Sequence, residues 1–233
     1  MFDIAWADGS VRRVRGKTMI KRASFGLLAA LAVFATPANA QNLVFNGSFE
    51  EAIVNPGGSF LTLGTGSTAI TGWTVSAGSI DYIGDYWNAQ DGDRSIDLAG
   101  SSLGTISQSV ATTALQFYTV DFYASRNPDG GEALRTGTIS FGGTTMPFQY
   151  SASNSLGNMN WQLYSYTFAA TGPFTLLSFA ADASAGCCWG PALDNVSMIA
   201  AIPEPEVWAM LLFGFGAIGF QLRRRGKLRT VTA

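Results

Sequence analysis

Apolar and polar residues alternate along many short segments between residues 41 and 202. In QFYTVDFYAS (116–125), Tyr118, Val120 and Phe122 fall on one face, and the residues between them fall on the other. This period of two predicts a β-strand, whereas no segment of the region shows the 3.6-residue apolar period of a long helix. The same alternation predicts strands at 94–100, 104–112, 161–170 and 174–182.

Residues that favour turns separate these segments. Asn127-Pro128-Asp129-Gly130-Gly131 and Gly142-Gly143 are the clearest examples, because Asn, Asp, Pro and Gly readily adopt the backbone angles of tight turns. Some nine or ten strands in one region of this length predict an all-β domain over 41–202, a two-sheet jelly-roll sandwich. The Pro-rich segment IPEPE (202–206) is the expected linker after it.

The region before this domain has the three parts of a secretory signal peptide. Lys21 and Arg22 precede an apolar run at 25–34, which ends at the small-residue cleavage site Ala38-Asn39-Ala40. We therefore predict a signal peptide over 19–40, cleavage by signal peptidase after Ala40, and a mature chain from Gln41. Residues 1–18 precede the better start at Met19, and we expect them to be a mis-annotated extension.

An uncharged run, 207–222, lies near the other end and is followed by Arg223, Arg224 and Arg225. Sixteen helical residues rise roughly 24 Å, against a hydrocarbon core of about 30 Å. We expect this run to form a short transmembrane helix, with the arginines cytoplasmic and the domain before Pro203 outside.

The order of these C-terminal elements resembles a PEP-CTERM sorting signal, which we assign to 203–233. Pro203-Glu204-Pro205 comes first, then the apolar run, then the arginine cluster and a basic tail over 223–233. The resemblance implies processing by an exosortase near Pro-Glu-Pro in a Gram-negative bacterium. It also implies a helix that anchors an inner-membrane intermediate only transiently, a cell-surface or extracellular destination, and a link to exopolysaccharide and biofilm.

Charge and composition exclude several functions. The domain has twelve acidic and three basic residues, a formal charge of −9, whereas the whole chain has −2. We expect such a domain to bind nucleic acids poorly, because contacts between basic side chains and phosphates supply most of the affinity for nucleic acids. The chain has no histidine, which excludes Ser-His-Asp triads and His-ligated zinc. A pair of carboxylates is the familiar hydrolytic site that this composition still permits. No feature of the sequence identifies such a pair, and we expect the protein not to be an enzyme.

Two cysteines, Cys187 and Cys188, are adjacent in the sequence. An exported location permits a disulfide. However, neighbouring Cα atoms are about 3.8 Å apart, below the usual range of roughly 4.4–6.8 Å. A strained bridge within the pair, free thiols and an intermolecular bond all stay open.

The domain also resembles the choice-of-anchor C family over 42–198. The matching pieces occur in family order: NLVFNGSFE, GWTV, GSIDYIG, DGDRSIDLAGSSLGTISQSVAT, NPDG and CCWGPALDNVSM. The resemblance implies a galactose-binding-like jelly roll on a surface protein, with contact to carbohydrate and no established catalysis.

In jelly rolls of similar pattern, the first and last strands lie side by side and hold a structural calcium ion. For this chain the resemblance implies that the side chains of Glu50 and Asp194 bind the calcium ion, and that the turn Asp91–Arg94 contributes to the site. Calcium prefers six to eight oxygen ligands and tolerates irregular geometry. The alternative is that Glu50 is solvated and that Asp194 caps a turn.

The segment IDYIGDYWNAQDGDRS places Tyr82, Tyr86 and Trp87 among four aspartates. Aromatic faces stack on sugar rings and carboxylates bind hydroxyls, so these residues and Trp189 are the predicted carbohydrate site. The alternative is that the aromatic residues belong to the core. We expect an exported, non-catalytic matrix or surface protein associated with exopolysaccharide. An adhesive coat protein that binds other proteins is the alternative, and a polysaccharide-modifying enzyme is the third class.

Overall fold

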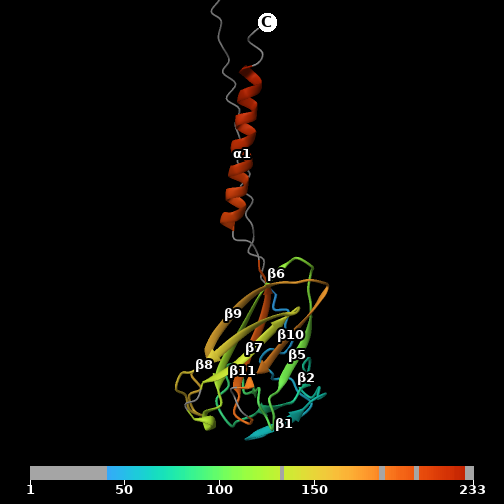
Figure 1. Cartoon of the computed structure of the whole chain (residues 1–233), viewed down its shortest axis with the longest axis vertical. Coiled ribbons are helices and arrows are strands. Elements are labelled where there is room, and N and C mark those ends of the chain that lie inside the picture. The colour runs from blue at the N-terminus through green and yellow to red at the C-terminus, as the bar shows by residue number, and fades with distance from the viewer. Residues whose placement is uncertain (1–40, 132–133, 184–186, 202–204, 229–233) are drawn as a thin grey trace, which may run out of the picture. The chain divides into compact units, whose positions relative to one another are not determined.

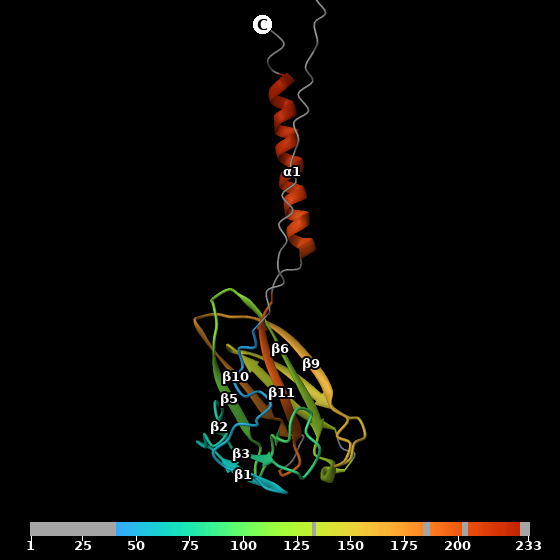
Figure 2. The ribbon, with the colours of Figure 1, turned by 180° about the vertical axis from the view of Figure 1, so that it is seen from behind.

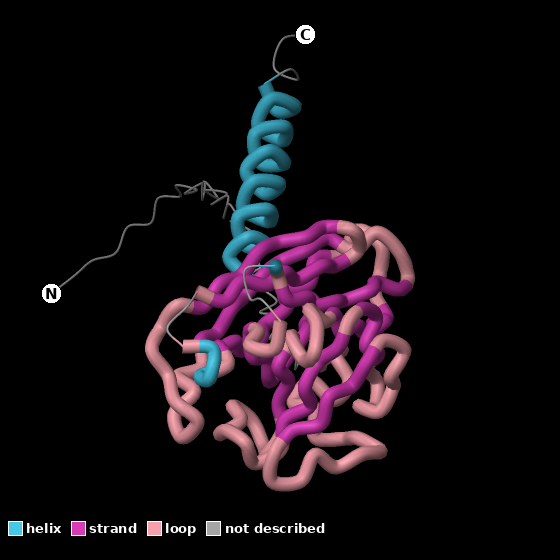
Figure 3. Tube along the Cα trace, turned by 60° about the horizontal axis from the view of Figure 1, so that its bottom comes forward, coloured by secondary structure: helices cyan, strands magenta, loops and turns pink. Residues whose placement is uncertain are grey.

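Two antiparallel sheets make up the domain (Figures 1 and 3). The computed structural model describes residues 41–131, 134–183, 187–201 and 205–228. Within these ranges the six-stranded sheet has the order β1-β3-β4-β11-β6-β9, and the five-stranded sheet the order β2-β5-β10-β7-β8. The strands are β1 (Phe60–Gly64), β2 (Thr74–Ala77), β3 (Ser79–Ile83), β4 (Ser95–Asp97), β5 (Thr105–Ala111), β6 (Phe117–Arg126), β7 (Arg135–Phe141), β8 (Thr144–Tyr150), β9 (Gln162–Ala169), β10 (Phe174–Ala181) and β11 (Pro191–Ala200).

The predicted all-β, two-sheet jelly-roll sandwich is confirmed, and so are the five strands predicted from alternation, which became β4, β5, β6, β9 and β10. In β6, Tyr118, Val120 and Phe122 are buried, as the pattern indicated. Phe122 packs across the interior against Phe148 of β8 and Phe179 of β10, with ring centroids 5.1 and 5.0 Å apart. The core therefore lies between the two sheets, where the inner faces of both meet.

Both predicted turns are present. Gly142 and Gly143, with φ of 57° and 90°, join β7 to β8 as a two-residue hairpin turn that needs positive φ. After β6, the short 3₁₀ helix η1 (Pro128–Gly130) follows Asn127, whose side chain accepts a hydrogen bond from the Asp129 backbone N–H. This cap sets the position of Asp129 at the end of β6.

The first described segment lies along the last strand, as the family resemblance implied. Leu43 N–H donates to Met198 O at 2.8 Å, and Val196 N–H donates to Gly47 O at 2.9 Å. A Cβ atom on Gly47 would lie 1.8 Å from Val196 O, so only glycine permits this approach. At the far edge of the same sheet, β1 and β3 run side by side (Figure 2).

The C-terminal element is a helix, α1 (Pro205–Leu228), but the prediction of a transmembrane helix over 207–222 is corrected. Among the residues that the structure describes, no helix combines the length and the apolar character needed to cross a membrane. The uncharged run is short, and it contains three glycines and Gln221 before the arginines begin.

Several predictions fall outside the described residues. These are the extension 1–18, the signal peptide with Ala38 and Ala40, and Pro203 and Glu204 of the sorting signal. Pro205 begins α1, and Arg223, Arg224 and Arg225 lie in its last part. The processing roles of all these residues stay predictions.

Candidate functional site

A pocket of about 300 Å³ opens on the face of the six-stranded sheet that points away from the second sheet. Strands β1 and β3 form its floor, and its walls come from the segments after β3, β4 and β6 and before β11. Segments far apart in the sequence therefore meet here. The side chains that matter most for binding are Phe60, Asp81, Tyr86, Trp87, Asp129 and Trp189.

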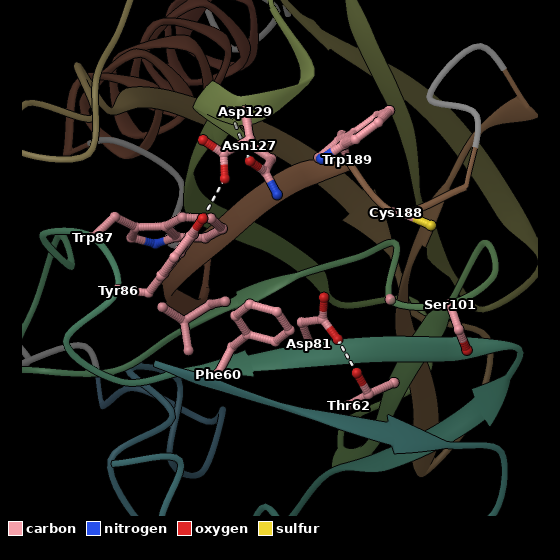
Figure 4. A pocket seen from close by; sticks show the side chains of 12 residues that line it. Phe60, Thr62, Asp81, Tyr86, Trp87, Ser101, Asn127, Asp129, Cys188 and Trp189 are labelled. Carbon is pink, nitrogen blue, oxygen red and sulfur yellow. Dashed lines mark hydrogen bonds between the residues drawn. The ribbon is translucent and has the colours of Figure 1, made fainter. Parts of the chain in front are cut away.

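Strand alternation puts Asp81 in the pocket. Ile80 and Tyr82 of β3 point into the core between the sheets, so Asp81 and Ile83 point the opposite way. The Thr62 hydroxyl donates to Asp81 Oδ1 at 2.6 Å. Within the described part of the chain, no donor contacts Asp81 Oδ2, which points into the pocket (Figure 4). Burial raises the pKa of Asp81, and the Thr62 hydrogen bond partly offsets this rise.

Asp97 lies next to Asp81 on the neighbouring strand and holds three pocket segments together. Its Oδ1 accepts from the backbone N–H groups of Ala99 at 2.8 Å and Gly190 at 2.9 Å. Its Oδ2 accepts from Asn127 Nδ2 at 2.8 Å. Complete burial raises the pKa of Asp97 to about 7, although all three hydrogen bonds act in the opposite direction. Asp97 is therefore a positioning residue beneath the pocket.

Aromatic rings form the sides of the pocket. Tyr86 and Phe60 pack edge to face, with ring centroids 5.4 Å apart, and the Tyr86 hydroxyl donates to Asp129 Oδ2. That hydrogen bond raises the pKa of Tyr86. Trp189 is 46% exposed and lies with Asp129 across the pocket from Asp81 (Figure 4). Exposed rings beside carboxylate oxygens offer both stacking and hydrogen-bonding groups to a ligand.

Three of the four predicted carbohydrate residues meet at this pocket, namely Tyr86, Trp87 and Trp189. Trp87 is only 3% exposed, donates from Nε1 to Ser95 Oγ at 2.8 Å, and packs against Ile83 and Met159. It therefore contributes only an edge to the pocket and is mainly a core residue, as the alternative held.

The placement of Tyr82 on a carbohydrate surface is wrong. Its side chain is 1% exposed and lies between the sheets, and its hydroxyl donates to Phe49 O at 2.7 Å. The alternation of β3 explains the error, because Asp81 and Tyr82 are neighbours and must point to opposite faces.

Sequence reasoning missed Phe60, Asp129 and Asn127 as pocket residues. Asn127 and Asp129 were visible only as turn residues, and Phe60 was visible only as an apolar residue before β3. Their role depends on pairing between β1 and β3 and on the hydrogen bond from Asn127 to Asp97. No local signal in the sequence reports either contact.

Glu50 and Asp194, the predicted calcium ligands, contact the same loop. Glu50 Oε1 accepts from the N–H groups of Asp93 and Arg94 at 2.8 and 2.7 Å. Asp194 Oδ2 accepts from those of Gln90 and Asp91 at 2.7 and 3.1 Å. Burial raises the pKa of Asp194 to about 8, although these hydrogen bonds act to lower it. Glu50 and Asp194 therefore hold the turn Asp91–Arg94, which was predicted to contribute to the calcium site.

A calcium ion at this position would need oxygen ligands beyond those of Glu50 and Asp194. Among the described residues, no group of three or more His, Cys, Asp or Glu side chains is arranged to hold a metal. Glu50 Oε2 is the oxygen of the pair to which no described group donates a hydrogen bond. Calcium binding stays a prediction.

Cys187 and Cys188 are free thiols in the structure, one of the states that the sequence left open. Cys188 has a φ of 83° and lines the pocket beside Trp189. Oxidation of the pair after export stays a prediction.

Comparison with solved structures finds carbohydrate-binding modules and a glycosidase. A family 16 carbohydrate-binding module matches with 13% identity and a TM-score of 0.40, over 68% of this chain and 99% of that one. The module TmCBM61 in complex with β-1,4-galactotriose matches with 14% identity and a TM-score of 0.43, over 70% and 100%. An arabinose-bound α-L-arabinofuranosidase matches with 12% identity and a TM-score of 0.47, over 68% and 26%. At these values the matches say nothing about what this chain binds.

Comparison of sequences finds a relative and two family models. Halomucin of Haloquadratum walsbyi (strain DSM 16790 / HBSQ001) is 36% identical over 161 residues, which cover 68% of this chain but 2% of halomucin. The model "Protein of unknown function (DUF642)" matches residues 42–199, and the model "PEP-CTERM protein-sorting motif" matches 201–225.

The second match confirms the predicted sorting signal, which implies export and exosortase sorting to the cell surface. The name choice-of-anchor C is not tested by either match. Because the first model covers more than half of the sequence, the chain belongs to the DUF642 family.

Proposed function

We propose that this exported protein binds an extracellular polysaccharide of its own cell through the pocket beside Asp81, without catalysis. One observation supports the proposal above all: a hollow of about 300 Å³ combines exposed aromatic rings with carboxylate oxygens. Rings provide apolar area for the faces of sugars, and carboxylates accept hydrogen bonds from hydroxyls. The setting we propose is the exopolysaccharide or biofilm matrix of a Gram-negative bacterium, after cleavage near Pro203-Glu204-Pro205.

Binding rather than hydrolysis fits the state of the pocket carboxylates. Asp81 and Asp129 each accept a hydrogen bond from a hydroxyl, of Thr62 and Tyr86 respectively. Asp97 is buried, and both of its carboxylate oxygens accept hydrogen bonds from N–H groups. We assign none of them a catalytic step.

Exposed apolar side chains favour the second candidate, an adhesive protein that binds other proteins. Leu115, Phe174 and Leu176 are 86%, 69% and 55% exposed. Phe174 and Leu176 lie two residues apart on the same face of β10, and exposed apolar side chains that gather on one face are typical of protein interfaces. The experiment below separates the two candidates, because Phe174 lies outside the pocket.

Trp189→Ala is expected to abolish most retention on polysaccharide. A stacked ring contributes about 1.4 kcal/mol or more, a factor of ten or more in the dissociation constant. Because nearly half of the Trp189 side chain is exposed, the melting temperature should stay within a few degrees of the wild-type value. Affinity electrophoresis of the full chain against a panel of bacterial polysaccharides measures the first quantity, and calorimetry measures the second.

Phe174→Ala, which removes another exposed ring, is the matched control and should retain wild-type binding. The proposal is wrong if no polysaccharide retards the wild-type chain. It is also wrong if Phe174→Ala loses as much binding as Trp189→Ala, because the pocket would then have no special role.

We also propose that calcium bound by Glu50 and Asp194 stabilises the loop at 90–94. A ligand that binds only the folded state raises stability by about 2.7 kcal/mol at a hundredfold excess over its dissociation constant. EDTA is therefore expected to lower the melting temperature by several degrees, and added CaCl₂ should restore it. Glu50→Gln should remove this response; an unchanged melting temperature of the wild-type chain in EDTA would exclude the site.

A further inference from the structure

We propose that the pocket selects sugars that carry a protonated amine, such as hexosamines without an N-acetyl group. This inference rests on the proposed function, since it names the class of polysaccharide that the same pocket binds. The observations that lead to it are the charges of the pocket, the free carboxylate oxygen of Asp81, and the arrangement of the rings.

The described side chains that line the pocket carry negative charge and no positive charge. The described residues that line it include Asp81 and Asp129 and no lysine or arginine. Arg94 contacts Asp85 instead, at 3.9 Å, and Arg135 Nη2 donates to Gly130 O at 2.7 Å. Carboxylates that lack a cationic partner bind an ammonium group more strongly than a neutral hydroxyl, because the hydrogen bond is then charge-assisted at both ends.

One acceptor is in place for such a group. Asp81 is 8% exposed, and its Oδ1 already binds the Thr62 hydroxyl. Its Oδ2 has no donor among the described residues and points into the pocket (Figure 4). A carboxylate oxygen that is open to the pocket can accept a charge-assisted hydrogen bond from a ligand, and an ammonium group supplies three N–H donors.

The rings around the pocket favour the same ligand. Phe60, Tyr86 and Trp189 come from three separate segments and border one cavity with the two carboxylates. The face of an aromatic ring attracts a cation, and the attraction is stronger when the pair is shielded from water. An N-acetyl group removes the charge and a uronic acid reverses it, so both should bind more weakly than the free amine.

The long-range field has the same sign. The domain carries a formal charge of −9, which attracts a polycation and repels a polyuronate. This attraction alone would be non-specific, so the test must separate the pocket from the rest of the acidic surface.

The experiment compares hexamers of glucosamine and N-acetylglucosamine as ligands of the full chain, by isothermal titration calorimetry at pH 6. We expect the glucosamine hexamer to bind at least tenfold more tightly. Asp129→Asn should reduce this preference to less than threefold while leaving the melting temperature unchanged, because Asp129 is exposed. Glu51→Gln removes one charge that is also exposed but lies away from the pocket, and it should keep the preference.

The results separate this inference from the proposed function. Equal affinity for the two hexamers, or binding only to other glycans of the panel, overturns the amine preference and leaves polysaccharide binding standing. An equal loss in Glu51→Gln and Asp129→Asn overturns it too, because it indicates attraction to the acidic surface in general. Absence of binding to every glycan overturns both proposals.

Discussion

Replacing Trp73 by alanine is expected to lower the free energy of unfolding by about 3–5 kcal/mol. The indole is 2% exposed and packs against Phe49 and Phe179, with centroids 5.3 and 6.4 Å away. Its Nε1–H donates to Asn46 O at 2.9 Å. The substitution therefore removes a large buried ring, opens a cavity and leaves a carbonyl without its donor.

The backbone near Trp73 indicates which segment should move when the ring is removed. Asn46 and Phe49 have positive φ values of 51° and 62°, a conformation that costs a bulky residue such as Phe about 1–3 kcal/mol. The ring of Trp73 contacts Phe49 and its N–H binds Asn46, so it helps to hold both in place. We expect the segment that precedes Glu50 to lose its position first.

Urea unfolding followed by tryptophan fluorescence measures this loss in the full chain. Trp189→Ala is the matched control and should change the free energy by less than about 0.5 kcal/mol, because exposed substitutions usually do. Trp73→Phe should lie between the two. A loss below about 1 kcal/mol for Trp73→Ala would contradict the placement of this ring in the core.

Stability is expected to fall as the pH rises from about 4 to about 7. Burial raises the pKa of Asp97 to about 7, against 3.8 for an ordinary aspartate. Between these values the folded state holds a proton on Asp97 that the unfolded state has released. The contribution of this group is therefore complete below pH 4 and is lost as the pH approaches 7, with a slope of about −1.4 kcal/mol per pH unit.

Urea unfolding at pH 4.5, 5.5, 6.5 and 7.5 measures the slope for the whole chain. The side chain at position 97 of the Asp97→Asn variant cannot titrate. The slope of the free energy of unfolding against pH should therefore be shallower by the contribution of one proton, about 1.4 kcal/mol per pH unit. Calorimetry of the wild-type chain and of Asp97→Asn in buffers of different ionisation enthalpy gives the same quantity independently, as about one proton more released by the wild-type chain on unfolding at pH 6. The comparison is needed because burial also raises the pKa of Asp194, to about 8. Equal proton release by the two chains would show that Asp97 is ionised in the folded state.

The two predictions concern different parts of the molecule. Trp73 belongs to the core between the sheets, whereas Asp97 lies under the pocket and binds Ala99, Asn127 and Gly190. Weakening at Trp73 should therefore affect global stability, and ionisation of Asp97 should also affect the geometry of the pocket wall. Glycan affinity measured across the same pH series would report this second effect.

Local patterns in the sequence predicted most of the fold. Alternation located β6, β9 and β10, because a sandwich strand has one face in the core and one in solvent. Successive residues point to these two faces in turn, so the pattern is visible in a single segment. The glycine pair at 142–143 marked a turn for an equally local reason, since tight turns need positive φ. The sorting motif was readable because it is a continuous segment.

The pocket was only partly predictable. Tyr86, Trp87 and Trp189 were found from composition, but composition does not distinguish a ring in the core from one at the surface. Alternation would have separated Asp81 from Tyr82 had the register of β3 been known. Phe60 and Asp129 lie far from the other pocket residues in the sequence, and only strand pairing and the Asn127–Asp97 contact bring them together.

The sequence by itself determined that the domain is an acidic β-sandwich without histidine, followed by a sorting motif. These properties depend on residue types and on neighbours along the chain. Only the tertiary structure decided which side chains share the pocket, which aromatic rings are buried, and that Asp97 is buried beneath the pocket. Those properties depend on the pairing of distant strands, since a face of a sheet collects one residue from each strand and no single segment contains the set.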